Sequence, residues 1–317
     1  MVVGFRMGDI VYTSVVTLGL STADIAAAVG RDPHLLCAGV ETILAPNVAG
    51  LAGLGLSCPQ IAHLVLVAGH SFRCRSIVSK LQYYQSLLGS HGNLLRVLKC
   101  SPFLLGSSND KVVKPNVAFL RECGLGDCDI ARLCRNKWIL STNLERARAL
   151  AARAEGLGVP RCSGMFKQAL HVVASLSEET IAIKVQYLKN TFRWSNAEVG
   201  IAVSRFPMVL TKSKNTLQSK SEFLILEVGL EPAYIAHRLV MLSYSLEGRL
   251  RPRYYVMRFL KENGLLDRDW DYCTSVKMSE NVFMEKYICP HKEAAPRLAE
   301  DYADACKGQV PTRFRFA

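Results

Sequence analysis

The sequence predicts an all-α fold, an α-solenoid of about seven helix–turn–helix repeats. A glycine–leucine pair recurs with its glycine at positions 19, 55, 124, 156, 229 and 264, so the gaps are 36, 69, 32, 73 and 35 residues. Two of these gaps are double steps, and the mean step is 35 residues. A fixed period of this length is typical of stacked repeats, in which each unit buries the apolar faces of its neighbours. Such proteins mostly bind other molecules.

The first helix of each repeat is predicted from a start signal that follows the pair. A serine with an acidic or amide residue three positions later forms a capping box, which satisfies free backbone N–H groups at a helix start. Apolar residues then recur at helical spacing, as at Ile61, Leu64 and Val65. The serine and its partner are Ser21 and Asp24, Ser57 and Gln60, and Ser195 and Glu198.

A proline about thirteen residues after the leucine position predicts the end of this helix. Pro33, Pro102 and Pro207 take that place, and apolar residues follow each of them. Proline cannot continue a helix interior, so we expect a short, tight turn there.

The second helix of each repeat is predicted to run from this turn to the next glycine, which would cap it in a left-handed conformation. Examples are 144–155, 178–189, 215–227 and 253–263, and the repeat is degenerate near Gly89 and Trp194. We therefore expect an N-terminal segment at 1–18, the repeat array at 19–269, and closing helices with a tail at 270–317.

Composition narrows the function classes. Hydrophobic residues make up 50% of the 317 residues, but the longest apolar stretch, 61–68, is far too short for a membrane span. The eleven cysteines form no C-x-x-C pair, and Cys289 with His291 lacks the second ligand pair of a zinc site. No nucleophile or carboxylate pair has a catalytic setting. We expect a monomer that is not an enzyme and has no metal, no cofactor and no membrane contact.

The net charge of +12 is unevenly distributed. Residues 1–72 carry −2, residues 73–269 carry +14, and residues 270–317 carry 0. The excess therefore falls on the middle and later repeats, which is the electrostatic pattern expected of a nucleic-acid-binding surface.

The cations also recur by position within the repeat. One group opens the second helix, including Arg73 and Arg75, then Lys111 and Lys114, and another lies late in the first helix. Equivalent positions of stacked repeats align in space, so we expect a ladder of cations matched to a phosphate backbone. The candidate contacts are Arg135, Lys137, Arg146, Arg148, Arg205, Lys212, Lys214, Arg249, Arg251 and Arg253.

Three alternatives remain open. The cations could form a solvated face with salt bridges, with Arg249 and Arg253 paired to Glu247 and nearby acids. Either Tyr254 or Tyr255 could face outward and stack on a base. The whole protein could instead be a protein-binding scaffold, which would present an exposed apolar groove.

The repeated unit, with Gly-Leu-Ser, Ile-Ala and Pro-x-x-Leu in order, resembles that of the mitochondrial transcription termination factor (mTERF) family. The turn at 206–210, Phe-Pro-Met-Val-Leu, is similar to the family's turn motif. The segments 243–253 and 283–287 resemble segments common in the plant branch. The resemblance extends from about residue 18 to 300, although the turn proline is missing at 70–72, 137–138 and 170–171.

This resemblance implies a left-handed superhelix whose repeats each contain two α-helices and a short 3-10 turn. It implies that a basic concave groove holds nucleic acid, with double-stranded DNA favoured and RNA used by some members. It also implies a mitochondrial or chloroplast location and a role in transcription, its termination or RNA processing. No targeting segment is visible in residues 1–20, which leaves either a cytosolic protein or a leader that lies upstream of this chain.

Overall fold

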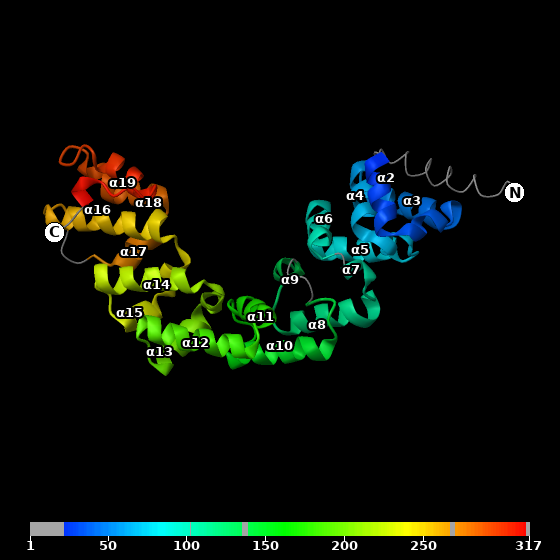
Figure 1. Ribbon diagram of the computed structural model, residues 1–317, viewed down its shortest axis with the longest axis horizontal. Helices are drawn as coiled ribbons and strands as arrows, with labels where there is room; N and C mark the ends of the chain where they lie inside the picture. Colours follow the sequence, from blue (N-terminus) through cyan, green and yellow to red (C-terminus); the bar gives the residue numbers. More distant parts are fainter. Residues whose placement is uncertain (1–21, 102, 135–138, 267–269, 315–317) are drawn as a thin grey trace. The chain divides into compact units, whose positions relative to one another are not determined.

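The fold consists of helices throughout its described part. The computed structural model describes residues 22–101, 103–134, 139–266 and 270–314, and these contain α-, 3-10 and π-helical segments without a strand (Figure 1). Two compact units divide the chain. Unit 1 comprises residues up to Ala152 together with Arg161–Lys167, and unit 2 comprises Arg153–Pro160 with the residues from Gln168 onward. The prediction of an all-α repeat fold is confirmed.

The first helices of the seven predicted repeats are all present in the described residues. Capping boxes at Ser57 and Ser195 are confirmed, whereas Ser21 lies outside the described residues. Where a proline was predicted to end the helix, a 3-10 turn follows at Pro33–Cys37 and Pro207–Thr211. These first helices are α2 (Thr22–Arg31), α4 (Cys58–Ala68), α6 (His91–Cys100), α9 (Asp127–Cys134), α11 (Phe166–Ser175), α13 (Asn196–Arg205) and α15 (Pro232–His237).

The second helices follow the turns as predicted, and four of them contain a wider π-helical stretch. Further turns lie at Gly69–Arg73, α7 (Phe103–Gly106) and Leu239–Ser243. The second helices are α3 (Ala45–Gly53, after the π-helical Val40–Leu44), α5 (Ile77–Leu88), α8 (Lys114–Glu122, after Asn109–Val113), α10 (Leu144–Gly156), α12 (Glu178–Phe192), α14 (Lys214–Glu222, continued by Phe223–Glu227) and α16 (Arg251–Glu262, after Leu246–Leu250).

One predicted turn is wrong. Leu170 and His171 lie inside α11, because a loop delays the helix start to Phe166 and the position thirteen residues after Leu157 therefore falls within the helix. The closing region contains α17 (Tyr272–Lys277), α18 (Glu280–Phe283), the π-helical Met284–Ile288, 3-10 turns at Cys289–His291 and Thr312–Phe314, and α19 (Leu298–Cys306).

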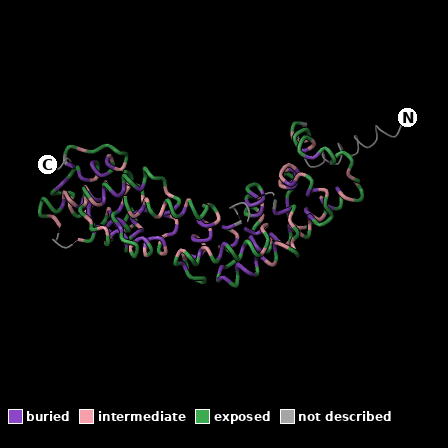
Figure 2. The backbone as a smooth tube through the Cα atoms, turned by 60° about the horizontal axis from the view of Figure 1, so that its bottom comes forward, coloured by how far each residue is buried: buried purple, intermediate pink, exposed green. Residues whose placement is uncertain are grey.

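The helices form two layers within each unit, one of first helices and one of second helices. In unit 1, α2 packs on α4 and α4 on α6, while α3 packs on α5. In unit 2, α13 packs on α15 and α12 on α14. The buried residues lie along the helix faces that meet these neighbours, and the exposed residues lie on the outer faces (Figure 2).

Each second helix also carries one polar side chain that reaches the following repeat. It lies three residues after one apolar residue and four before another, as Lys80 lies between the buried Ile77 and Tyr84. Its N–H groups donate hydrogen bonds to main-chain carbonyls where the next repeat's first helix or turn ends. We call these side chains the clamp residues, and they are Asn47, Lys80, Asn116, Arg153, Lys184, Lys220 and Arg253.

The clamp residues recur every 31 to 37 residues. The last main-chain carbonyls of a helix have no N–H partner within that helix, so they need hydrogen-bond donors from elsewhere. A side chain with several N–H groups on the preceding repeat supplies these donors and joins the two repeats.

Candidate nucleic-acid interface

The ten candidate cations differ in what they contact. Arg135 and Lys137 lie outside the described residues. The other eight lie on two kinds of position, the start of a second helix or the end of a first helix. Their surroundings decide which of them can meet a ligand.

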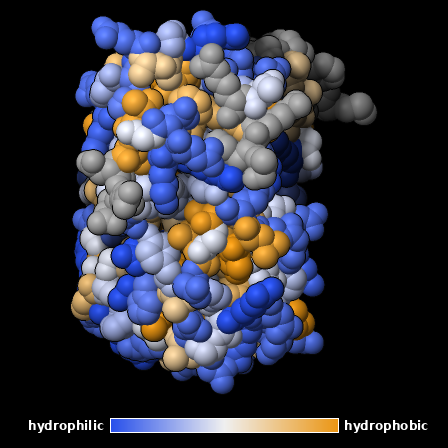
Figure 3. All heavy atoms as spheres, turned by 90° about the vertical axis from the view of Figure 1, so that its left-hand side faces the viewer, coloured by the Kyte–Doolittle hydropathy of each residue, from blue (hydrophilic) through white to orange (hydrophobic). Residues whose placement is uncertain are grey.

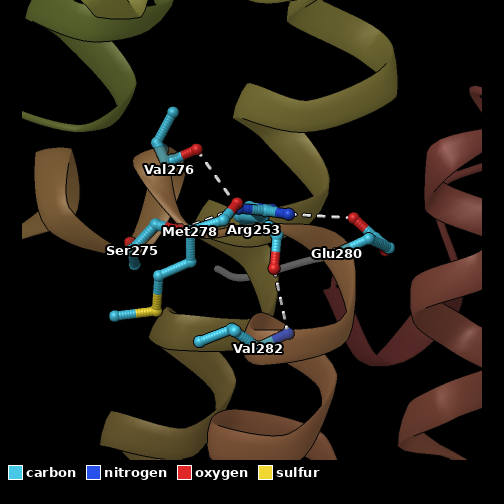
Figure 4. A network of polar contacts seen from close by, with 7 residues as sticks. Arg253, Ser275, Val276, Met278, Glu280 and Val282 are labelled. Carbon is cyan, nitrogen blue, oxygen red and sulfur yellow. Dashed lines mark hydrogen bonds and ion pairs between the residues drawn. The ribbon is translucent and has the colours of Figure 1, made fainter.

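Arg253 is a clamp residue, and the prediction that it contacts a phosphate is wrong. Its side chain is 0% exposed, and its Nη1 donates to the carbonyls of Ser275, Val276 and Met278 at 2.9, 3.1 and 2.7 Å. Its Nη2 pairs with Glu280 at 2.8 Å. Figure 4 shows the guanidinium enclosed by these groups. Sequence alone cannot separate this arginine from its exposed neighbours, because the residue type is the same.

Arg251 and Arg249 behave differently from one another. Arg251 is partly buried and pairs with Glu247 at 2.9 Å and with Glu227 at 3.4 Å, so two carboxylates offset its charge. The pairing to Glu247 that sequence analysis left open therefore belongs to Arg251. Arg249 lies over the ring of Tyr244, with 4.7 Å between its Cζ and the ring centroid, and has no ion pair among the described residues.

Lys212 and Lys214 flank the N-terminal end of α14. Lys214 is exposed, and its Nζ lies 5.4 Å from the centroid of the Tyr187 ring. Tyr187 Oη donates to the Lys214 carbonyl at 3.1 Å, and Lys184 Nζ donates to the Lys212 carbonyl at 3.0 Å. Two side chains of the preceding helix thus hold the main chain that carries both lysines.

Arg205, Arg146 and Arg148 are all exposed. Arg205 ends α13 and donates to the His237 carbonyl of the next first helix at 3.3 Å, so it also joins two repeats. Arg146 and Arg148 lie in the first turns of α10, where the Asn143 side chain accepts the Arg146 N–H at 2.7 Å. That cap fixes the start of α10 and, with it, both arginines.

Alignment of the second helices on their clamp residues reveals a basic stripe in unit 1. Arg75, Lys111 and Arg148 each stand five residues before a clamp residue, in three consecutive repeats. All three are exposed, and none forms an ion pair with another described residue. We call these three residues the basic stripe. The same position in unit 2 holds Glu179, Asn215 and Gly248.

Sequence reasoning included Arg148 among the ten candidates but left Arg75 and Lys111 in the wider set of recurring cations. The signal that would have found them is the second-helix pattern itself, apolar-x-x-(Asn, Lys or Arg)-x-x-x-apolar. Arg75, Lys111 and Arg148 fall at the same place when the repeats are aligned on this polar residue. They do not when the repeats are aligned on the glycine that precedes the first helix, because the turns in between differ in length.

Neighbouring cations of unit 1 are paired to acids. Arg73 binds Asp32 through two hydrogen bonds of 2.5 and 3.1 Å, and this partner lowers the pKa of the Asp32 carboxyl below its ordinary value. Lys114 pairs with Asp110 at 2.5 Å, which raises the pKa of the lysine. These ion pairs offset the charges of Arg73 and Lys114. The three cations of the basic stripe, in contrast, form no ion pair with a described carboxylate.

Aromatic stacking is not supported for Tyr254. Its side chain is buried, its Oη donates to the Glu227 carbonyl at 2.7 Å, and its ring packs edge-on against Phe223 and Tyr272. Tyr255 is half-buried beside Phe314. The outward-facing tyrosine that sequence analysis considered is therefore not Tyr254.

One face of the surface is hydrophilic over most of its area and contains an apolar patch near its centre (Figure 3). The large apolar side chains that are exposed belong to separate elements and include Leu36 in unit 1 and Ile183 and Leu226 in unit 2. A protein-binding scaffold would rest on surfaces of this kind.

Among the described residues, no three histidine, cysteine or acidic side chains are grouped so that they could hold a metal ion. In the same part of the chain, none of the helices has the length and apolarity that crossing a bilayer requires.

Comparison with known proteins identifies the family. A family model described as mTERF matches residues 14–236 and 161–284. The chain belongs to the mTERF family. A comparison with curated proteins gives no match. The match covers all seven helix pairs of this mTERF chain and ends at residue 284, within the closing region. The repeats described above are therefore mTERF repeats. Family membership indicates a nucleic-acid-binding role in organelle gene expression.

Proposed function

We propose that this mTERF protein binds a nucleic-acid duplex, with DNA favoured over RNA, through the exposed cations at the starts of its second helices. It would thereby act in transcription, transcription termination or RNA processing in mitochondria or chloroplasts. The observation that carries the proposal is the basic stripe of Arg75, Lys111 and Arg148, which no described carboxylate neutralises.

The spacing of the basic stripe suits a phosphate backbone. Packed helices lie about 8–10 Å apart, and one strand of a duplex advances about 3.4 Å per phosphate. Second helices stacked at that distance would place successive cations of the basic stripe about three phosphates apart. Contacts of this kind fix the position of a duplex and carry little sequence information. In unit 2 the proposed contacts are the exposed Lys214 and the partly exposed Lys212 and Arg249, which lie near the starts of their second helices.

The test is the salt dependence of duplex binding by the variant R75A/K111A/R148A. Loss of three phosphate contacts should lower the slope of log K against log salt by about 3 and weaken binding about 10-fold or more at about 0.15 M salt. Fluorescence anisotropy with labelled DNA and RNA duplexes and single strands measures both quantities and ranks the four ligands.

The matched control is K114A/R121A/R258A. It removes the same formal charge from cations that already pair with Asp110, Asp127 and Glu262, so its slope should stay close to that of the parent. Equal losses in both triple variants would remove the basic stripe from the interface. A parent protein that binds none of the four ligands would contradict the proposed function as a whole.

A further inference from the structure

We propose that the clamp residues position the phosphate-binding cations of the following repeat, so that affinity for nucleic acid depends on side chains that never contact it. The inference rests on the proposed function. The hydrogen bonds of the clamp residues would then contribute to ligand binding as well as joining consecutive repeats.

The clamps of unit 1 hold main-chain carbonyls that lie one to six residues before each cation of the basic stripe. Asn47 Nδ2 donates to the Phe72 carbonyl at 2.8 Å and the Cys74 carbonyl at 3.4 Å, and Arg75 is the next residue. Lys80 Nζ donates to the Leu105 carbonyl at 2.6 Å, ahead of Lys111. Cys74 and Arg75 belong to the short connection between the turn and α5, whereas Leu105 lies in the turn α7 and Lys111 lies in the π-helical Asn109–Val113 that opens the second helix.

The third clamp of unit 1 follows the same arrangement. Asn116 is 0% exposed, and its Nδ2 donates to the carbonyls of Leu140 and Thr142 at 3.1 and 2.6 Å. Asn143 then caps α10, and Arg146 and Arg148 follow. Both protons of one amide are therefore used to fix the two carbonyls that precede these arginines.

The clamps of unit 2 hold the cations there in the same way. Lys184 donates to the Lys212 carbonyl, as described above. Lys220 Nζ donates to the carbonyls of Leu242 and Tyr244 at 2.8 and 2.5 Å, and the Tyr244 ring lies under Arg249. In both repeats the clamp holds the main chain of the residue that carries or supports the cation.

The physical reason is preorganisation. A long basic side chain on a mobile turn must be ordered when it meets a phosphate, and that ordering opposes binding. A turn whose carbonyls are fixed from the preceding repeat has lost this freedom already when the protein folds. The clamp should therefore strengthen binding through the cation it positions.

Arg153, which also pairs with Glu178 at 3.0 Å, provides a control within the chain. It clamps the carbonyls of Val173 and Leu176 at 3.1 Å each, but the helix start that follows carries Glu178 and Glu179. Loosening this clamp should disturb the fold to a similar degree without moving a phosphate contact.

The test is a double-mutant cycle between Asn116→Leu and Arg148→Ala on the full chain, read by DNA-duplex binding. N116L removes both donors without changing the charge, so it should weaken binding about threefold and lower the salt slope by about 1. In the R148A background, N116L should have little further effect, because residues that act through one another are not additive. R153Q should leave the salt slope unchanged.

A second cycle, N47L with R75A, tests the same inference in case N116L does not fold, and thermal unfolding checks each variant. Equal effects of the clamp substitution in both backgrounds would overturn the inference, as would a loss with R153Q equal to that with N116L. Both results require a parent protein that binds the duplex, so they are distinct from a failure of the proposed function, in which the parent does not bind.

Discussion

At the scale of single residues, lysine and arginine serve two purposes in this chain. Those at clamp positions donate to carbonyls of the next repeat. Others at the starts of second helices, namely Arg75, Lys111, Arg148 and Lys214, are exposed to solvent. Arg253 and Arg249 are four residues apart, yet the first is fully buried and the second lies over Tyr244. Charge counts along the sequence add the two kinds together, so they overstate the number of cations available to a ligand.

Burial of the clamp residue Lys220 changes its pKa and its contribution to stability. The residue is 5% exposed, and burial, with a smaller effect from nearby Lys212, lowers the pKa of its ammonium to about 8 from an ordinary value of 10.5. The unfolded chain therefore holds this proton more tightly than the folded protein. The contribution of Lys220 to stability is unfavourable below about pH 8 and improves as the pH rises toward 10.5.

Replacing Lys220 should remove this pH dependence. Between pH 8 and 9.5 the free energy of unfolding of the parent should rise relative to that of K220M by about 1 kcal/mol per pH unit. Urea unfolding at several pH values measures the difference, and K261M, which changes an exposed lysine, should follow the parent. Parallel curves for the parent and K220M would show that Lys220 keeps an ordinary pKa in the fold.

At the scale of elements, the repeat depends on how each second helix ends. Gly124 has a φ of +81°, and a β-carbon there would lie 2.6 Å from Cys162 Cα. Both the backbone conformation and the lack of space therefore require glycine at this position. The same left-handed place is taken by Arg193, at φ +56°, in the repeat that lacks the pair. There the main-chain N–H of Trp194 still donates to the Lys189 carbonyl at 3.0 Å.

These two positions should respond oppositely to substitution. Arg193→Gly should stabilise unit 2 by about 0.5–1 kcal/mol, because glycine adopts a positive φ without strain. Gly124→Ala should destabilise unit 1 by more than about 2 kcal/mol, because the nearest atom belongs to the main chain. Urea unfolding followed by circular dichroism gives both values. Gly30→Ala, where nothing lies within 4 Å, is the control, and a loss there as large as at Gly124 would contradict the steric argument.

The sequence predicted these elements well where the signal is local. The Ser57 and Ser195 capping boxes and the turns at Pro33 and Pro207 depend on neighbouring residues alone, and they form as expected. The predicted cap at Gly156 is wrong by two residues, because Gly156 is the last residue of α10 and Gly158 takes the positive φ of +77°. Two glycines with the same spacing to a leucine could not be told apart without the packing around them.

At the scale of the whole molecule, the repeat period and the family were within reach of the sequence, but the interface was not. Period and capping are one-dimensional patterns, and a family model describes the same patterns. Which cation is free depends on partners 22 to 41 residues away, such as Ser275 for Arg253 and Asp32 for Arg73. Those partners become neighbours only when the repeats stack.

The two units differ in the cations that they offer. The basic stripe belongs to unit 1, whereas unit 2 has Glu179, Asn215 and Gly248 at the same positions and presents Lys212, Lys214 and Arg249 instead. The starts of the second helices are thus the common location of the proposed contacts in both units.

Hydrogen exchange of the full chain with and without a bound DNA duplex tests this location most directly. The account predicts slower exchange on binding in the segments that carry the basic stripe, 73–80, 108–116 and 143–150, because phosphate contacts and the clamped turns behind them are stabilised together. Protection confined to the closing helices at 270–314, or exchange that is unchanged at those three segments while the duplex is bound, would contradict it.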